Sequence, residues 1–464
     1  MKTLTVGEIA AAVGGRRVGG RDDLPLGAVS TDSRDAPAGS LFVALRGERF
    51  DGHAFLDAAA RRGCGAAMVE PGCEPAAGAF PGGLVVVDDT LAGLGRLAKW
   101  HRRQVPATVV AVTGSNGKTT VKRMIHHVLA RRARGTCSPR SFNNSVGVPL
   151  TLLGVGPEDD YVVCELGSNA PGEIAALGAI AEPDLAVITC VAPAHLAGFG
   201  SLEGVAAEKA SLLGALGEGG AGVVHADSEA LGAAVANCER RLVRFGESEA
   251  AELRLTARQP APDGQSVEIN GDVRLHLQVH GRHNALNALA AMATAEQLGW
   301  SLPEAAAAMA GFEPVEMRLE PVECGPVTLL NDAYNANPGS VVAAAETLAE
   351  IPARRRILAV GDMLELGPDA RSLHERTGEA VAERGVDCVV GVGELGGLLA
   401  AAAGRCGARA VRFGDVAEAA EGLVELLEPG DVLLLKGSRA TGMERLVEPV
   451  RAAFADAPAP EGPR

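Results

Sequence analysis

The sequence predicts an α/β fold in three domains, and three observations support this prediction. Strand-like apolar runs alternate with helical segments rich in Ala and Leu, which is typical of parallel α/β layers. The length of 464 residues suits about three domains of roughly 150 residues each. A glycine-rich segment at 113–120 stands between an apolar strand and a helix. We therefore expect a small α/β domain, a central P-loop-type domain with a mostly parallel sheet, and a Rossmann-like C-terminal domain.

Changes in this pattern place the domain boundaries near residues 85 and 315. The first domain, 1–85, has a short strand at 41–45 and a helix at 55–62. A linker-like helix at 91–104 opens the second domain, 86–315. The third domain, 316–464, ends in a Pro- and Ala-rich tail at 455–464 that we expect to be disordered. Further strands are expected at 108–112, 161–165, 185–189, 222–225, 327–330, 356–360, 388–392 and 432–435, and further helices at 121–131, 284–298 and after Pro303.

The composition excludes several classes of partner. Lys and Arg number 43 against 58 Asp and Glu, and the formal net charge of −15 disfavours nucleic acid and anionic membranes. Aromatic residues make up only 3% of the chain, too few for a base-stacking surface. The nine cysteines include no C-x-x-C pair, which indicates buried reduced thiols. No uncharged apolar run reaches the length of a membrane span. We expect a cytoplasmic monomer without membrane insertion.

The segment 113–120 has the features of a phosphate-binding loop. Glycines at 114 and 117 let backbone amides wrap a polyphosphate, and the following helix N-terminus adds its own N–H groups. Lys118 can reach the β- and γ-phosphates, and the Thr119 hydroxyl can bind Mg²⁺. Residue 112 is Val, so the strict P-loop pattern is not met, but strand, loop and helix follow in the required order. ATP binding is predicted for Gly114, Ser115, Asn116, Gly117, Lys118, Thr119 and Thr120.

Three further residues suggest a metal site. Glu165 ends the next predicted strand, at the edge where open α/β sheets bind ligands. A buried carboxylate is costly unless it is paired or metal-bound, and we favour the metal. His195 follows the strand at 185–189, and its position is as consistent with a metal or phosphate contact as with simple packing. Lys209 lies on the next helix, and considered alone it is a surface cation.

Together these motifs resemble the Mur ligases, ATP-dependent amide-forming enzymes of peptidoglycan precursor synthesis, over nearly the whole chain. The resemblance implies that Glu165 and His195 bind metal and that Lys209 is carbamoylated. A protonated ammonium cannot bind a cation, whereas a carbamate is a carboxylate-like oxygen ligand. Two Mg²⁺ ions are implied. The segment 281–288 is similar to the helix start at which Asn284 contacts adenine, and Arg318, Asp332 and Asn335 are implied to hold the nucleotide.

Two motifs, 332–338 and 436–439, resemble the branch of the family that joins D-alanyl-D-alanine to UDP-N-acetylmuramoyl-tripeptide. In that branch ATP converts a carboxylate into an acyl phosphate, which the amine of the dipeptide attacks, with Lys118, His195 and Lys209 as the implied catalytic residues. The first domain is then a UDP-substrate domain, and the third closes on the nucleotide. The implied substrate contacts are Ser33, Arg34, Arg46, Gly47, Asn143, Asn144, Tyr334, Asn337, Lys436, Ser438 and Arg439.

Other functions remain as alternatives. The sequence Gly-Val-Gly-Glu-Leu-Gly at 391–396, with Asp415 about twenty residues further on, matches a dinucleotide fingerprint and suggests an NAD(P)-linked oxidoreductase. A tight glycine turn in a Rossmann-like domain is the favoured interpretation. Another Mur-type or folylpolyglutamate ligase would share the loop and the metal residues, but not 332–338 together with 436–439. A non-catalytic P-loop switch would not need Glu165, His195 and Lys209.

Overall fold

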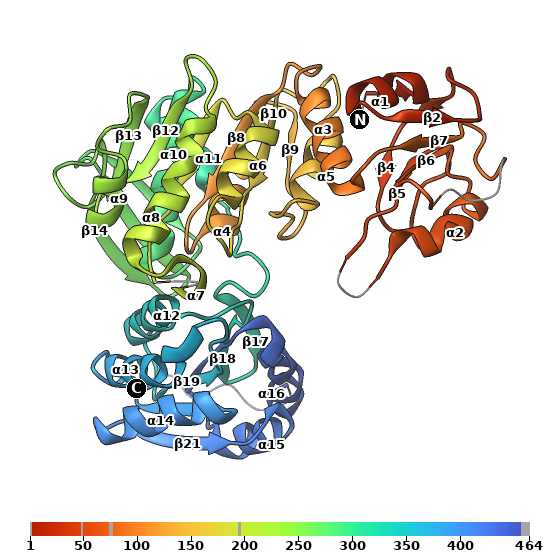
Figure 1. Cartoon of the computed structure of the whole chain (residues 1–464). Helices are drawn as coiled ribbons and strands as arrows, with labels where there is room; N and C mark the ends of the chain where they lie inside the picture. Colours follow the sequence, from red (N-terminus) through yellow and green to blue (C-terminus); the bar gives the residue numbers. More distant parts are fainter. Residues whose placement is uncertain (1, 48–49, 74–77, 194–195, 456–464) are drawn as a thin grey trace.

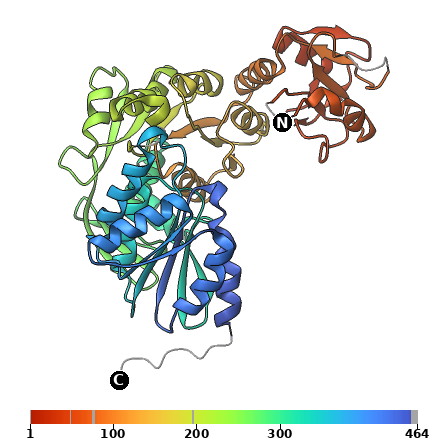
Figure 2. The same ribbon diagram turned by 60° about the horizontal axis from the view of Figure 1, so that its bottom comes forward.

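The computed structural model describes residues 2–47, 50–73, 78–193 and 196–455, and it folds into three α/β domains arranged one after another (Figure 1). The central domain contacts both of the others, whereas the N-terminal and C-terminal domains lie apart in both views (Figure 2). The predicted fold class is confirmed. Of the tail that we expect to be disordered, only Ala455 belongs to the described residues.

The N-terminal domain is built on a five-stranded sheet of order β2-β7-β6-β5-β4. Strands β4 to β7 pair in parallel, and β2 pairs with β7 in antiparallel fashion. Helix α1 begins at a capping box in which Thr5 and Glu8 bond each other's backbone N–H. The elements are β1 Leu4–Thr5, α1 Val6–Val13, β2 Arg16–Val18, β3 Pro25–Leu26, β4 Val29–Ser30, β5 Leu41–Val43, α2 Leu56–Arg61, β6 Ala66–Val69 and β7 Leu84–Val86.

Helix α3, Thr90–Arg102, joins this domain to the central one and is the predicted linker helix. Its first turn is capped by the Asp89 carboxylate, which accepts the Ala92 N–H. Leu94 and Leu97 of α3 are completely buried. They belong to one apolar cluster that includes Ile9 of α1 and Val109 of the central sheet. The hydrophobic core is therefore continuous from the first domain into the second.

The central domain contains a nine-stranded sheet of order β16-β15-β14-β13-β12-β11-β8-β10-β9. The run from β9 to β14 along this order is parallel, as predicted, while β14, β15 and β16 form an antiparallel extension. The elements are β8 Thr108–Thr113, α4 Lys118–Leu129, β9 Gly135–Cys137, α5 Gly147–Leu153, β10 Tyr161–Glu165, α6 Glu173–Ala181, β11 Leu185–Ile188, α7 Leu196–Phe199, α8 Leu202–Ala210, β12 Ala221–His225, α9 Glu229–Ala234, β13 Arg241–Gly246, β14 Leu253–Ala261, β15 Gly264–Ile269, β16 Val273–Leu277, α10 Arg282–Gln297 and α11 Leu302–Met309.

The C-terminal domain has a six-stranded sheet of order β17-β18-β22-β19-β20-β21, parallel except for β17. This arrangement, with helices on the sheet, is the predicted Rossmann-like domain. Its elements are β17 Glu320–Cys324, β18 Val327–Asp332, α12 Pro338–Glu350, β19 Arg356–Gly361, α13 Ala370–Ala382, β20 Cys388–Val392, α14 Glu394–Arg405, β21 Arg409–Phe413, α15 Val416–Leu426, β22 Val432–Lys436 and α16 Val447–Phe454.

The fingerprint at 391–396 is a packing turn at the start of α14. The Asp362 carboxylate accepts the Gly396 N–H at 2.7 Å. A Cβ added to Gly391 would lie 2.1 Å from the Gly396 carbonyl oxygen, and one added to Gly393 would lie 2.8 Å from Asp362. An internal carboxylate thus sits at the helix N-terminus, where a dinucleotide would place its pyrophosphate. This arrangement disfavours the oxidoreductase alternative.

Several predicted element ends differ from the structure. The helix expected at 121–131 begins three residues earlier, at Lys118, because Gly117 has φ of 83° and turns the chain directly into the helix. The strand expected at 41–45 ends at Val43, and the helix expected at 91–104 covers Thr90–Arg102. All nine cysteines fall within the described ranges and are free thiols there; five are buried, while Cys406 is exposed. No described helix is long and apolar enough to span a membrane.

Buried and half-buried histidines give the fold a predicted pH dependence. Burial lowers the pKa of six of them, His101, His126, His225, His280, His283 and His374, below 6.5. Below pH 6.5 the unfolded chain therefore binds protons that the folded chain does not, and the free energy of unfolding should fall. Each histidine contributes up to about 1.4 kcal/mol per pH unit. Urea titrations between pH 7.5 and 5.5 measure this loss.

His374 offers a test of this pH effect at one residue. Its Nε2 accepts the Met363 N–H at 2.8 Å, and its Nδ1 lies 2.6 Å from the Ala370 carbonyl oxygen. Protonation of Nε2 would break the first of these bonds. His374→Gln should flatten the decline in stability, whereas the control His276→Gln changes an exposed ring and should leave it unchanged. A stability that stays constant from pH 7.5 to 5.5 would contradict the prediction.

Candidate active site

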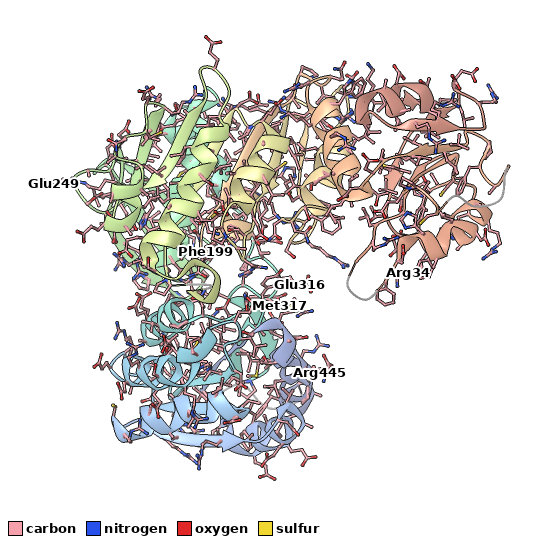
Figure 3. The ribbon with its side chains drawn as sticks, in the orientation of Figure 1. Arg34, Phe199, Glu249, Glu316, Met317 and Arg445 are labelled. Atoms are coloured by element: carbon pink, nitrogen blue, oxygen red, sulfur yellow. The ribbon has the colours of Figure 1, made fainter. Side chains whose placement is uncertain are left out.

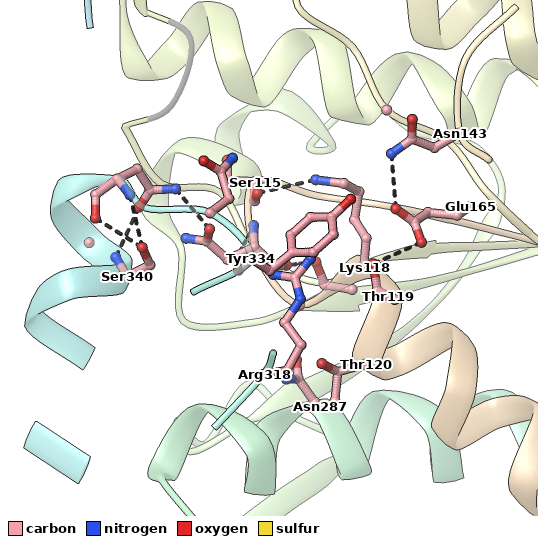
Figure 4. Close-up of a pocket in the computed structure, with 18 of the residues that line it drawn as sticks. Ser115, Lys118, Thr119, Thr120, Asn143, Glu165, Asn287, Arg318, Tyr334 and Ser340 are labelled. Atoms are coloured by element: carbon pink, nitrogen blue, oxygen red, sulfur yellow. Dashed lines mark hydrogen bonds between the residues drawn. The ribbon is translucent and has the colours of Figure 1, made fainter. Parts of the chain in front are cut away.

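A cavity of about 740 Å³ lies between the central and C-terminal domains (Figure 4). It is lined by the phosphate loop, the end of β10, the start of α10 and the segment that leads into α12. Most of the predicted site residues converge there. These are Ser115, Asn116, Gly117, Lys118, Thr119, Thr120, Asn143, Asn144, Glu165, Asn284, Arg318, Asp332, Tyr334, Asn335, Asn337 and Lys436.

The phosphate loop depends on both of its glycines. Gly114 has φ of 145° and Gly117 has φ of 83°, conformations that other residues rarely adopt. A Cβ on Gly114 would lie 2.0 Å from the Thr189 hydroxyl oxygen, and one on Gly117 would lie 2.5 Å from Asn287 Oδ1. Larger residues at these positions would push the loop away from β11 and α10.

The side chain of Lys118 bends back over the loop. Its Nζ donates to the carbonyl oxygens of Gly114 at 2.7 Å and Ser115 at 3.2 Å. Burial lowers the pKa of the ammonium group. A half-buried cation held by neutral carbonyls gains from an anionic partner, so the geometry favours a phosphate ligand.

Glu165 is almost fully buried at the carboxyl end of β10, and each of its oxygens has a partner. Oε2 accepts from the Thr119 hydroxyl at 3.0 Å and from Lys122 Nζ at 2.9 Å, and Oε1 accepts from Asn143 Nδ2 at 3.0 Å. Burial alone would raise the pKa of Glu165, but the Lys122 and Lys118 ammonium groups lower it below its usual value. The carboxylate is therefore charged and fixed in place. Its pairing with Lys122 is a contact that the sequence analysis missed.

Lys209 is buried, not a surface cation. Its side chain lies behind the cavity wall, and its Nζ donates to the Ser168 hydroxyl at 2.6 Å. Ser168 itself lines the cavity. Burial, together with the nearby Lys118 charge, lowers the pKa of Lys209 to about 7. A large fraction of this amine is therefore neutral near pH 7. His195, the third predicted metal-binding residue, lies outside the described residues.

Residues of the C-terminal domain line the cavity and are held there by polar contacts. Asn337 caps α12 and donates from Nδ2 to Asn116 Oδ1 of the phosphate loop at 2.8 Å. Lys436 Nζ pairs with Asp332 Oδ2 at 2.6 Å and donates to the Asn335 carbonyl oxygen at 3.1 Å. The loop of the central domain and the sheet edge of the C-terminal domain thus form opposite walls of one cavity.

Arg318 stands at the junction between the two domains. Its guanidinium carbon lies 3.9 Å from the centre of the Tyr334 ring. Met317 and Leu319 on either side have φ of 55° and 53°, and these two left-handed residues turn the chain at Arg318. Figure 3 shows Glu316 and Met317 between the two domains. An ion pair between Arg258 of β14 and Glu350 of α12 also crosses this junction.

The end of the cavity that is predicted to hold the nucleoside lies at the start of α10. Asn284 donates from Nδ2 to the His280 carbonyl oxygen at 2.8 Å and accepts from Asn287 Nδ2 at 3.0 Å. Asn287 was missed in the sequence, although it follows Asn284 by three residues and therefore shares its helix face. His225, at the end of β12, also lines the cavity.

The remaining predicted residues lie elsewhere. Gly114 belongs to the loop but not to the cavity wall. Ser438 Oγ accepts the Leu364 N–H at 2.9 Å, and Arg439 pairs with Glu444. Ser33, Arg34, Arg46 and Gly47 follow the carboxyl ends of the adjacent parallel strands β4 and β5 in the N-terminal domain.

In these N-terminal loops the two arginines are held by neighbouring carboxylates. Arg34, labelled in Figure 3, is exposed, and its hydrogen bonds lower the pKa of Asp32 to about 2. Arg46 contacts Asp51 and Glu70. The structure therefore does not bring the N-terminal residues to the cavity.

The residues of the cavity fit a divalent cation. Glu165 and Thr119 provide the oxygen ligands that Mg²⁺ prefers, and their side chains already meet at 3.0 Å. Within the described ranges, no three His, Cys, Asp or Glu side chains converge as a metal site. The predicted set differs from such a cluster because it uses a hydroxyl, a single carboxylate, a modified lysine and His195, which lies outside the described residues.

Comparison with known proteins gives a consistent result. Models of the Mur ligase middle domain and of the Mur ligase glutamate ligase domain match residues 112–295 and 317–439. The UDP-N-acetylmuramoyl-tripeptide--D-alanyl-D-alanine ligase of Escherichia coli strain K12 is 39% identical over 456 residues, which cover 96% of this chain and 98% of the relative.

Solved structures agree over similar lengths. MurF from Acinetobacter baumannii superposes with a TM-score of 0.87 at 31% identity, over 97% of this chain and 99% of that one. The MurF ligase from Thermotoga maritima in complex with ADP gives a TM-score of 0.82 at 28% identity, over 92% and 98% of the two chains. With a phosphate loop, a buried carboxylate and a third domain facing them, the chain belongs to the Mur ligase family.

Proposed function

We propose that this chain is an ATP-dependent ligase that joins D-alanyl-D-alanine to UDP-N-acetylmuramoyl-tripeptide, giving UDP-N-acetylmuramoyl-pentapeptide, ADP and phosphate. The relatives that match nearly its whole length carry this activity in their names. The observation that carries the proposal is the single cavity that joins the phosphate loop to Asp332, Tyr334, Asn337 and Lys436. We further propose that the enzyme acts as a cytoplasmic monomer on these small molecules.

The reaction follows from the chemistry of the acceptor. A carboxylate resists attack by an amine because it is negatively charged and oxide is a poor leaving group. A carboxylate oxygen of the tripeptide therefore first attacks the γ-phosphorus of ATP, and ADP leaves. The amine of the dipeptide then attacks the carbonyl carbon of this acyl phosphate, and phosphate leaves as the amide forms.

Lys118 and the start of α4 act on the transferred phosphoryl group. In the structure Lys118 Nζ contacts the carbonyl oxygens of Gly114 and Ser115. With ATP on the loop, the ammonium turns to the β- and γ-phosphates, and the free N–H groups of α4 face the same oxygens. Their positive charge stabilises the charge that builds up during transfer.

Thr119, Glu165, His195 and carbamoylated Lys209 are the residues that would hold magnesium, with Thr119 on the nucleotide side. Carbamoylation requires a neutral amine, and the lowered pKa of Lys209 supplies one near pH 7. The Ser168 hydroxyl at 2.6 Å positions this amine. When bound, Mg²⁺ neutralises negative charge on the phosphoryl oxygens and on the substrate carboxylate.

The three domains divide the substrates among them. We assign the UDP-sugar to the first domain, 1–85, through Ser33, Arg34, Arg46 and Gly47, and to the central loop of Asn143 and Asn144. The central domain, 86–315, binds ATP, with Asn284 at the adenine. In the third domain, 316–464, Arg318, Asp332 and Asn335 bind the nucleotide, and the remaining residues contact the peptide ends. These are Tyr334, Asn337, Lys436, Ser438 and Arg439.

Product analysis tests the proposal directly. The protein is incubated with ATP, Mg²⁺, D-alanyl-D-alanine and UDP-N-acetylmuramoyl-tripeptide ending in either diaminopimelate or lysine, and the products are analysed by mass spectrometry. We expect the pentapeptide mass, together with phosphate release that depends on the dipeptide. Phosphate release without the dipeptide, or no pentapeptide from either tripeptide, would overturn the assignment.

A further inference from the structure

The most deeply buried cation near the site is one that the proposed reaction does not use. Lys122 of α4 is 1% exposed, and it forms an ion pair with Glu165 in which both side chains are almost completely enclosed. We propose that Lys122 is a positioning residue that fixes the loop 138–146 to Glu165, and thereby sets the affinity for the UDP-sugar substrate. This proposal rests on the proposed function, which assigns Asn143 and Asn144 of that loop to the substrate.

Lys122 connects three segments through one ammonium group. Its Nζ donates to Glu165 Oε2 at 2.9 Å and to the Arg140 carbonyl oxygen at 2.5 Å. Lys122 follows Thr119 by three residues, so both lie on the same face of α4. Thr119 donates to the same carboxylate oxygen. The helix that starts at the phosphate loop is thus linked to the carboxylate and to the substrate loop.

The substrate loop is wrapped around this carboxylate. The Glu165 N–H donates to Ser138 Oγ at 2.9 Å, and Asn143 Nδ2 donates to Glu165 Oε1 at 3.0 Å. The Gly167 N–H donates to the Asn143 carbonyl oxygen at 2.8 Å. Between these anchors Arg140 has φ of 44°, a left-handed conformation that is costly for a residue with a side chain. The bond from Lys122 holds the loop at that point.

The next residues of the loop depend on the same geometry. Asn144 Oδ1 accepts the N–H groups of Val146 and Gly147 at the start of α5. Asn144 is therefore held by hydrogen bonds to the start of α5, whereas Asn143 is held by its hydrogen bond to Glu165. A loop freed at Arg140 would let Asn143 move relative to Asn144. The predicted consequence concerns binding of the UDP-sugar more than binding of ATP.

A purely stabilising role accounts less well for this lysine. An ion pair taken fully out of water loses much of its attraction to the cost of desolvation, and apolar residues of similar volume often stabilise a core equally well. Methionine has nearly the shape of lysine, but it cannot donate to both a carboxylate and a carbonyl. Unlike an apolar side chain, Lys122 orients the two groups that accept its hydrogen bonds, the Glu165 carboxylate and the Arg140 carbonyl.

Steady-state kinetics of Lys122→Met tests the proposal. Loss of a side chain that orients a metal ligand, as Lys122 orients Glu165, typically costs 10–100-fold in metal affinity or activity, and we take the lower end of this range as the expected loss of substrate affinity. We expect the KM for UDP-N-acetylmuramoyl-tripeptide to rise by about tenfold or more, while the Kd for ADP changes less than threefold. Arg123→Met is the matched control, because it removes a positive charge from the next position of α4 at an exposed site. It should leave both constants unchanged.

A second pair of variants keeps the test valid if Lys122→Met leaves Glu165 unpaired and unfolds the chain. Glu165→Gln is compared with Glu165→Gln/Lys122→Met, which has no buried charge at this position. Calorimetry with the UDP-tripeptide should show binding at least tenfold weaker in the double variant, with similar Kd values for ADP.

These measurements separate the two proposals. If the wild-type protein makes no pentapeptide, the proposed function fails, and the role of Lys122 fails with it. If the wild-type protein makes pentapeptide and the tripeptide constants are equal with and without Lys122, only the positioning role is wrong. Equal losses of affinity for the UDP-tripeptide and for ADP would also overturn the positioning role, because they would indicate a general loosening of the fold.

Discussion

Lys118→Ala is expected to lower the rate of ATP-dependent phosphate release by about a thousandfold, the upper range for loss of one group that stabilises transition-state charge. Lys118 belongs to the phosphate loop, and its Nζ lies 2.7 Å from the Gly114 carbonyl oxygen. Alanine leaves the N–H groups of α4 in place, so nucleotide should still bind, but the charge on the transferred phosphoryl group loses its partner.

The fold should survive this change. Among the described residues, Lys118 donates hydrogen bonds only to carbonyl oxygens of its own loop and takes part in no ion pair, so its removal breaks none there. Phosphate release and the thermal midpoint are measured together, with Arg123→Ala, an exposed residue of the same helix, as the control. Turnover close to the wild-type rate in a folded Lys118→Ala protein would refute the assignment of the loop.

Lys209→Ala should have an effect of similar size, and one that can be reversed chemically. The buried amine has a pKa of about 7, and its neutral form can react with carbon dioxide. Under the proposed carbamoylation, the wild-type protein should lose activity when bicarbonate is removed. Alanine removes the group entirely. Because the space left by the side chain adjoins Ser168, a short carboxylic acid can place its oxygens where the proposed carbamate would lie.

The rescue experiment compares activity with and without added acetate or formate. Lys209→Ala should recover part of its activity, while Lys118→Ala should recover none, since its missing group is a cation. Lys99→Ala is the control, because Lys99 is a partly exposed lysine paired with Glu182. Activity that responds neither to bicarbonate removal nor to added carboxylic acid would show that Lys209 is not carbamoylated.

The features predicted most accurately are those that depend on residues close together in the chain. Parallel strands such as β10 are continuous buried runs, and β10 was predicted at its observed bounds. Strands β14 to β16 were missed because they are partly solvent-exposed on one face; β16, for example, alternates exposed and buried residues and lacks an apolar run. The glycines of the phosphate loop were recognised by their spacing, and the structure shows that a Cβ atom at either position would clash with a neighbouring side chain.

The contacts between distant residues could not be predicted in the same way. Lys122 and Glu165 are 43 residues apart in the chain, and Lys122 follows a motif whose pattern ends at Thr119 and Thr120. A lysine on a helix is usually solvated, so only the fold reveals that it is buried. Lys209 was considered a surface cation on sequence evidence alone, and it was the family resemblance that singled it out.

The apolar core that runs through α3 has a consequence for folding. One cluster contains Ile9, Leu97 and Val109, whereas the clusters of the third sheet contain residues from Leu319 onward. The first two domains are therefore expected to unfold as one cooperative unit, although the proposed function assigns them different substrates, and the third domain is expected to unfold separately. Cutting the chain near residue 86 would split a core, while cutting near residue 316 would sever polar contacts. The expected folding units of this chain therefore differ from the three domains to which we assign the substrates.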